Sequence, residues 1–481
     1  MRFPKFFNFF RTLREDELKL FQKYLKRQYG SHSDALAVFD YVKKFHPDFQ
    51  DEKKLTLDYI HRKVFGVEID SNEHNRTKLS NIFSDLYLWL KAFLLTEKAN
   101  SDAFESRYLW LTILKERALL PDFSADITAL QTELAHLPRR NVMDYWKCAT
   151  VDQWFFDYLA HHSSTPQSKA FQPFADSLEL YYLLARLKMA CEAVNLKNID
   201  REQLFPSWLQ RPEIPDWLDT DQYPLLQMYR AVYELFAGLG DRQYAGVEAI
   251  LTAHAGQIDP LELDILLTYM RNYASSQVRH GEEQPWQKIH QLDKLGITHD
   301  IWKAKGTITT TQYHNIVNTA GKANASDWGE SFISEYETRL PENLRDDAVL
   351  LARCILLFER KEYAVIAEKL AHMNPRDLYL FIRLKTMMLR CYYELDRDQN
   401  TILDYCTASE YGLKRFRKPG EEAVVATFHF IRLVKMLVRQ KMPREAVVSK
   451  IQSTVPVFFK TWLLEKAKRY KEKFAPRRTS R

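Results

Sequence analysis

Apolar residues recur every three or four positions along almost the whole chain, which is the spacing of one face of an α-helix. The segment from about Glu73 to Leu95 is a clear example, because leucine, isoleucine and phenylalanine repeat there at helical spacing. Similar patterns cover residues 15–25, 34–45 and 55–65, and Thr12 with Glu15 has the spacing of a capping box. These four segments predict an N-terminal helical unit at residues 1–100.

The pattern continues after Ser101, which is expected to cap the next helix, and predicts helical hairpins over residues 101–197. It breaks over residues 198–224, where four prolines force the residues before them out of helical geometry. Residues 198–224 are therefore predicted to be a linker or domain boundary. We expect helical repeats at residues 225–440 and a C-terminal helix with a basic tail at residues 441–481.

Helix pairs are clearest in the second half of the chain, for example residues 348–358 with 363–370 and residues 378–395 with 401–411. The helix at 424–438 is apolar nearly all round, so neighbours should enclose it. Only the β-branched run Thr307–Thr311 is ambiguous, as a lone strand or a stiff helix start. The predicted fold class is all-α: an α-solenoid-like stack of helical hairpins with an N-terminal helical unit.

Composition supports this class. The 481 residues include only 13 glycines, where average usage would give roughly 34. Folds rich in tight turns or phosphate-binding loops use glycine heavily, because only glycine reaches positive φ at low cost. A glycine-poor chain therefore favours helices joined by short loops.

Two short sequences resemble the returning helix of a tetratricopeptide-type hairpin. They are Arg242-Gln243-Tyr244-Ala245 running to Leu251, and Lys361-Glu362-Tyr363-Ala364 running to Leu370. The resemblance covers about residues 224–440, without the family's 34-residue period, and implies stacked helices with an extended binding surface. Leu18-Lys19-Leu20-Phe21 and Phe45-His46-Pro47-Asp48-Phe49 also resemble the opening of uncharacterised bacterial all-helical proteins, which imply no known activity.

Charge is distributed unevenly along the chain. The net charge is +6, yet residues 411–481 contain 19 basic and 5 acidic residues, a net of +14, so the rest of the chain carries −8. This basic end could contact a nucleic acid or another polyanion, or it could be a solvated end or a dock for the acidic body. The candidate contacts with an anionic partner are Lys414, Arg415, Arg417, Lys418, Lys466, Lys468, Arg469, Lys471, Lys473, Arg477 and Arg478.

The sequence contains no recognisable motif for catalysis, cofactor binding or metal binding. It has no phosphate-binding loop, no Gly-x-Ser-x-Gly elbow and no His-Glu-x-x-His pattern, and its one Gly-x-Gly, at Gly238 and Gly240, is predicted to cap a helix. The five cysteines are scattered, which indicates buried thiols in a reducing compartment, and we expect a cytoplasmic protein. The longest apolar run, residues 86–95, is far shorter than the ~20 residues needed to cross a membrane.

Together these observations predict a non-catalytic protein–protein interaction scaffold that uses no cofactor and no metal. Its protein partner is not identifiable from sequence. Two alternatives remain open. One is a nucleic-acid-associated protein that uses the basic C-terminal region, and the other is an enzyme whose site is assembled from dispersed residues.

Overall fold

The protein is all-α, as the sequence predicts. The structure is a computed structural model that describes residues 4–30, 33–47, 49, 51, 53–66, 73–162, 168–199, 214–215, 218–238, 244–278, 285–416 and 422–469. In these residues the regular structure is helical, and β-type pairing is limited to one isolated bridge between Arg140 and Ile258. Short 3₁₀ turns occur at Lys43–Phe45, Thr220–Gln222, Ala255–Gln257, Glu337–Arg339 and Glu342–Leu344.

The chain divides into two compact units. The first comprises residues 1–133 and 157–166, and the second comprises residues 134–156 and 167–481. Two helices, α7 (Leu120–Ala135) and α8 (Val142–His162), contribute residues to both units. Each unit has a hydrophobic core of its own.

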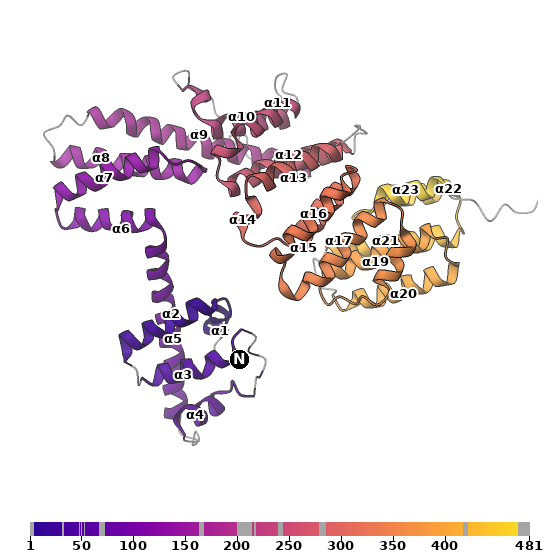
Figure 1. The fold of residues 1–481 in the computed structure, drawn as a ribbon, viewed down its shortest axis with the longest axis horizontal. Helices are drawn as coiled ribbons and strands as arrows, with labels where there is room; N and C mark the ends of the chain where they lie inside the picture. Colours follow the sequence, from indigo (N-terminus) through magenta and orange to yellow (C-terminus); the bar gives the residue numbers. More distant parts are fainter. Residues whose placement is uncertain are drawn as a thin grey trace, which may run out of the picture. The chain divides into compact units, whose positions relative to one another are not determined.

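The first unit is built around the long helix α5, which α1 to α4 contact (Figure 1). Phenylalanines from α1, α2, α3 and α5 fill its core, and their rings contact one another at 5.4–5.6 Å between centroids. Because aromatic side chains bury large apolar areas, this cluster gives a small unit a substantial core. The helices are α1 Pro4–Phe10, α2 Glu15–Tyr29, α3 Asp34–Val42, α4 Leu57–Phe65, α5 Glu73–Ser101 and α6 Ala103–Glu116.

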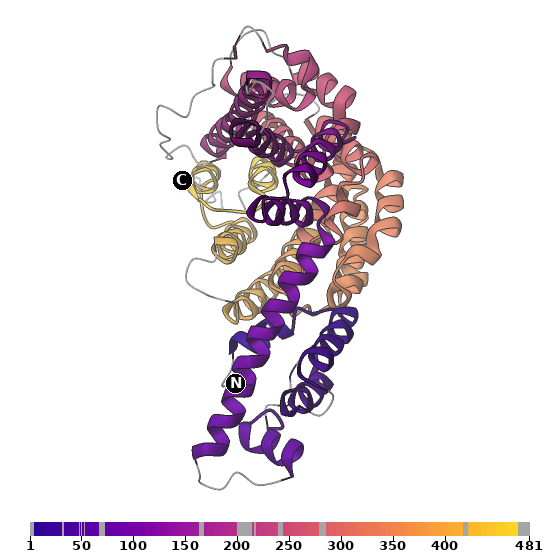
Figure 2. The same cartoon turned by 90° about the vertical axis from the view of Figure 1, so that its left-hand side faces the viewer.

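In the second unit, helices contact their neighbours along the chain and, repeatedly, the helix two places further on. Thus α13 contacts α15, α15 contacts α17, α17 contacts α19 and α19 contacts α21 (Figures 1 and 2). The bounds are α9 Ser168–Ile199, α10 Pro224–Ala237, α11 Tyr244–His254, α12 Pro260–Val278, α13 Pro285–Thr298, α14 Ile301–Lys305, α15 Thr310–Lys322 and α16 Ser326–Tyr336. They continue with α17 Arg345–Glu359, α18 Tyr363–Leu370, α19 Leu378–Glu394, α20 Gln399–Lys414, α21 Glu422–Arg439, α22 Arg444–Ser453 and α23 Lys460–Lys468.

Two predicted helix starts are wrong, one by one residue and the other by two. Ser101 is the last residue of α5, and Asp102 caps α6 because its carboxylate accepts hydrogen bonds from the backbone N–H groups of Phe104 and Glu105. Helix α2 begins at Glu15 rather than after Thr12, whose hydroxyl donates to Phe9 O. At the start of α2 it is the Glu17 carboxylate that accepts from the backbone N–H of Arg14, the residue before the helix.

The ambiguous run at residues 307–311 is the start of a helix. Thr309 caps α15 by accepting from Gln312 N, and the Gln312 side chain reaches back to Thr309 N. This reciprocal capping box satisfies two backbone donors and fixes where α15 begins. The predicted glycine cap is confirmed at Gly238, which follows α10 in the left-handed conformation, while Gly240 lies outside the described residues. Most of the predicted linker at residues 198–224 also lies outside the described residues.

The expectation of buried thiols holds for four cysteines. Cys191, Cys354, Cys391 and Cys406 are buried, Cys148 is partly exposed, and all five are free.

The prediction that neighbours enclose the helix at 424–438 is confirmed for most of its surface, since eight residues of α21 are buried. In the described part of the chain, every helix is too short or too polar to cross a bilayer.

Gly412 allows helices α19 and α20 to pack closely. A Cβ atom at Gly412 would lie 2.6 Å from Phe381 Cζ. The Gly412→Ala variant is therefore expected to lower the free energy of unfolding by about 1–2 kcal/mol, because overpacking outweighs the roughly 1 kcal/mol gained in helix propensity. Guanidinium denaturation followed by far-ultraviolet circular dichroism measures this change.

Gly246 in α11 is the matched control, because a Cβ atom at Gly246 would have no neighbour within 4 Å. Gly246→Ala should therefore raise the free energy of unfolding by up to about 1 kcal/mol. If both variants shift stability in the same direction, close packing does not explain Gly412.

Candidate functional site

A pocket of about 470 Å³ lies in the second unit, among helices α12, α13, α14 and α15. Its walls combine carboxamides, hydroxyls, one arginine, two carboxylates, two tryptophans and two isoleucines. The lining residues are Asp264, Thr268, Arg271, Asn272, Ser275, Trp286, Ile289, Asp293, Trp302, Gln312, Asn315, Ile316, Asn318 and Thr319.

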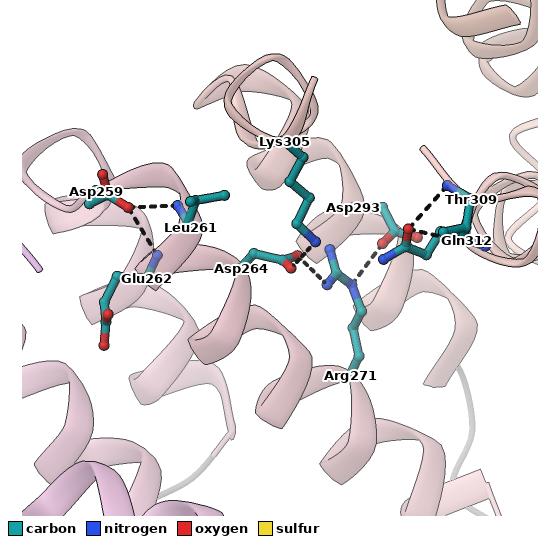
Figure 3. Close-up of polar contacts among 9 residues, drawn as sticks. All are labelled: Asp259, Leu261, Glu262, Asp264, Arg271, Asp293, Lys305, Thr309 and Gln312. Carbon is teal, nitrogen blue, oxygen red and sulfur yellow. Dashed lines mark hydrogen bonds and ion pairs between the residues drawn. The ribbon is translucent and has the colours of Figure 1, made fainter. Parts of the chain in front are cut away.

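Helix α12 supplies one wall because it is polar on one face and apolar on the other. Its buried face consists of Leu263, Leu266, Leu267, Met270 and Ala274. Its pocket face follows at the same helical spacing with Asp264, Thr268, Arg271, Asn272 and Ser275. The N-terminus of α12 is capped, since the Asp259 carboxylate accepts hydrogen bonds from Leu261 N and Glu262 N and Pro260 occupies the first turn (Figure 3).

An ionic network forms one side of the pocket (Figure 3). Arg271 Nε donates to Asp293 Oδ1 over 2.8 Å, and Arg271 Nη1 lies 3.5 Å from Asp264 Oδ1. Lys305 Nζ lies 2.5 Å from the other oxygen of Asp264. Because these groups come from α12, α13 and α14, the network fixes the positions of three helices around the pocket.

Asp293 is the most buried member of this network, with 3% of its surface exposed. Burial raises the pKa of Asp293 to about 6, and the adjacent Arg271 guanidinium limits that rise. At neutral pH the carboxylate is therefore ionised and held by Arg271. It is engaged in the protein's own structure and not free to contact a ligand.

Three carboxamides in the pocket have their orientation set by neighbours. Asn272 Nδ2 donates to Asn195 Oδ1 over 2.9 Å, which leaves the Asn272 oxygen as an acceptor. Asn315 Oδ1 accepts from Arg383 Nη2 over 2.9 Å, which leaves the Asn315 amino group as a donor. Gln312 Oε1 is occupied by the Thr309 cap, so its amino group is also a donor. These bonds leave one oriented acceptor and two oriented donors among the residues that line the pocket.

The two tryptophans add flat apolar surface, and each has a lysine over its ring. Lys322 Nζ lies 4.2 Å from the Trp286 ring centroid, and Lys305 Nζ lies 4.8 Å from that of Trp302. Both tryptophans line the pocket, but Trp302 is only 4% exposed, whereas Trp286, at the first turn of α13, is partly exposed. The apolar surface that a ligand can reach is therefore mainly that of Trp286.

The chemistry of the pocket suits hydrogen-bonded recognition. Its two carboxylates are held by Arg271 and Lys305, so neither is positioned as a free general base. In the described residues, His, Cys, Asp and Glu side chains nowhere gather in a group of three that could hold a metal ion. The pocket groups that are left to contact a ligand are oriented amides beside an aromatic surface.

The structure describes five of the basic residues predicted to contact an anionic partner, and two of these, Lys466 and Arg415, are engaged within the protein. Lys466 is buried in an ion pair of 2.6 Å with Glu394, and Arg415 donates to Pro375 O while it lies over the Phe381 ring. Lys414, Lys468 and Arg469 are exposed. Arg417, Lys418, Lys471, Lys473, Arg477 and Arg478 lie outside the described residues.

Sequence reasoning missed the residues of this pocket. The polar stripe of α12 has the same pattern as a solvated helix face, and Asp293 is a single acidic residue in an otherwise ordinary helix. The sequence did contain a partial signal for the pocket, because amides and tryptophans occur at helical spacing along α12, α13 and α15. Only the packing of the three helices shows that these faces converge.

Comparisons with known proteins give no match: no family model, no curated protein and no solved structure matches this chain. The resemblance to tetratricopeptide-type hairpins therefore stays a prediction.

Proposed function

We propose that this protein is a non-catalytic interaction scaffold whose pocket at α12, α13 and α15 binds an extended segment of a partner protein. The observation that supports this proposal is the set of oriented amides, in which Asn272 offers an acceptor while Asn315 and Gln312 offer donors. An extended peptide exposes unpaired N–H and C=O groups along its length, which are the complementary groups.

The aromatic surface supports the same function. A partner side chain that covers Trp286 would bury apolar area next to the hydrogen-bonding groups, an arrangement common at the centre of protein interfaces. The ionic network of Arg271, Asp264 and Asp293 fixes the helices that carry these groups. A rigid site loses little conformational entropy on binding.

Affinity capture from a lysate of the source cells tests this proposal. The Asn272→Ala/Asn315→Ala variant is expected to retain specific partners about 5- to 150-fold less well than the wild type, because two hydrogen bonds contribute about 1–3 kcal/mol together. A synthetic peptide that spans the captured segment then gives the affinity directly by calorimetry.

The control is Asn343→Ala/Asn400→Ala, which removes two exposed asparagines that do not line the pocket. It should capture the same partners as the wild type. Equal capture by the pocket variant and the control would contradict the proposal.

A function in nucleic-acid binding has less support. Two of the described basic residues, Arg415 and Lys466, already make contacts within the protein. The nucleic-acid alternative therefore stays a prediction from the sequence.

A further inference from the structure

Three cations on helices α15 and α19 lie near enough to influence one another, since the charge of Arg390 acts on Lys322 and that of Arg383 acts on Arg390. We name Lys322, Arg383 and Arg390 the cationic patch. The patch adjoins the pocket at two points, because Arg383 donates to the pocket residue Asn315 and Lys322 lies over the pocket residue Trp286. A ligand in the pocket can therefore reach the patch.

The aromatic rings around Arg390 fix its orientation. Its guanidinium carbon lies 4.3 Å from the centroid of the Phe358 ring and 3.8 Å from that of Phe459. Arg390 Nε donates to Thr386 O over 3.4 Å, and its terminal amino groups have no hydrogen-bond or ion-pair partner in the described residues. A guanidinium fixed in this way presents a planar pair of donors, which matches the two oxygens of a carboxylate.

Few acidic groups of the protein compensate this positive charge. Lys322 and Arg390 make no ion pair with a described residue, and Arg383 is bonded to the neutral groups of Asn315 and Tyr379. The exposed Glu359 acts on both Lys322 and Arg390, and Glu394, which is paired with Lys466, also acts on Arg390. The patch therefore keeps an excess of positive charge.

Arg390 remains charged at neutral pH despite its burial. Burial lowers the pKa of Arg390 to about 10 and also lowers the pKa of Lys322, while Glu359 opposes both shifts. Partly desolvated cations without a carboxylate partner are costly for the protein alone. An anionic ligand would remove this cost, which indicates that the patch is built to receive one.

We propose that the cationic patch binds the carboxylates of an acidic segment of a partner protein. This inference rests on the proposed function, since the same segment would continue from the amides of the pocket onto the patch. An acidic peptide fits better than a nucleic acid. The patch holds three cations over two helices next to groups that match a peptide backbone, whereas nucleic acids need a longer basic track that follows the phosphates.

Fluorescence anisotropy with a labelled oligoglutamate peptide tests this inference on the full chain. Wild-type protein is expected to bind the peptide, and salt should weaken binding. The Lys322→Gln/Arg383→Gln variant should bind about tenfold more weakly or worse, because two charge-assisted hydrogen bonds are lost. Arg390→Gln should have a comparable effect, but the double variant remains the primary test because Arg390 also packs between two rings.

The matched control is Lys369→Gln/Arg376→Gln, which removes one exposed lysine and one exposed arginine elsewhere in the same unit. The control and the patch variant have the same net charge. A difference in peptide affinity between them therefore reflects where the removed cations lie and not the total charge. Circular dichroism confirms that both remain folded.

Three results would overturn the inference: no binding of oligoglutamate at low ionic strength, equal loss of binding in both double variants, or tighter patch-dependent binding of a single-stranded oligonucleotide. Failure here is distinguishable from failure of the proposed function. If a captured partner requires Asn272 and Asn315 but binds the Lys322→Gln/Arg383→Gln variant normally, the pocket is a binding site and the patch is not part of it.

Discussion

Lowering the pH from about 7 to about 5 is expected to reduce the stability of the protein, relative to its His314→Gln variant, by about 2 kcal/mol. His314 is fully buried in α15. Its Nε2 lies 2.7 Å from Ala348 O and donates to it, whereas its Nδ1 has no hydrogen-bond partner among the described residues. Protonation would place a charge in this closed site.

Burial lowers the pKa of His314 to about 3, from an ordinary value of 6.5, and the positive charge of Arg383 contributes to the shift. The folded protein therefore keeps the imidazole neutral, while the unfolded chain binds a proton below pH 6.5. The stabilising contribution is complete above pH 6.5 and is lost as the pH falls towards about 3. Over that whole interval the loss amounts to about 5 kcal/mol, at about 1.4 kcal/mol per pH unit.

The comparison with His314→Gln is needed because Asp293 acts in the opposite direction. Since burial raises the pKa of Asp293 to about 6, from 3.8, that carboxyl adds stability as the pH falls through the same interval. Glutamine can still donate to Ala348 O but does not titrate. The difference between the two proteins in how stability changes with pH is therefore due to His314.

Denaturation by guanidinium at several pH values provides the measurement. The His372→Gln variant, in which an exposed histidine is changed, should follow the wild type at every pH. Parallel stability curves for wild type and His314→Gln would show that His314 does not couple folding to protonation.

Replacing Glu262 with glutamine is expected to lower the free energy of unfolding by about 3 kcal/mol, at the lower end of the range for breaking a buried ion pair. Glu262 is 6% exposed. Its carboxylate accepts from Lys188 Nζ at 2.8 and 3.0 Å and from the hydroxyl of the buried Tyr229. These three residues come from α9, α10 and α12, so one carboxylate connects three helices of the second unit.

The expected loss is at the lower end because the side chain of Lys188 is 31% exposed and can be partly hydrated after the substitution. The buried hydroxyl of Tyr229 cannot be hydrated in this way. Burial and the negative charge of Glu262 hold the pKa of Tyr229 far above its ordinary value, so its hydroxyl stays a donor that needs an acceptor.

Chemical denaturation of Glu262→Gln and of Glu330→Gln tests this prediction. Glu330 faces Arg353 over 3.6 Å with both side chains more than 40% exposed, so its loss should change stability by less than about 0.5 kcal/mol. Adding Tyr229→Phe to Glu262→Gln should cost less than the two single effects together, because the substitutions share one contact. Similar small effects for both glutamates would show that the network does not support the fold.

Much of the fold follows from the sequence. The repeat of apolar residues identifies helices such as α5 and α12, and the capping chemistry of glycine at Gly238 identifies a helix end. Errors occurred at helix starts such as Ser101, where the next residue, Asp102, makes the better cap. Capping depends on neighbours within about one turn, so sequence reveals that a helix begins but places its first residue only approximately.

The candidate site was not predictable in the same way. A polar side chain on a helix has the same sequence pattern whether it faces water or another helix. The sequence pattern groups Lys466 with a basic surface, yet Lys466 pairs with Glu394, 72 residues earlier in the chain. Asp293, His314 and Glu262 likewise acquire their properties from burial by helices distant in sequence.

By itself, then, the sequence determined that this protein is all-α, because a period of 3.6 residues is a local property that the order of apolar residues records directly. The tertiary structure alone decided which polar faces meet, and thereby formed the pocket and the cationic patch. Glu262 and Lys188 are 74 residues apart, and Arg383 and Asn315 are 68 residues apart. Contacts over such distances depend on how whole helices pack, which no local pattern of residues records.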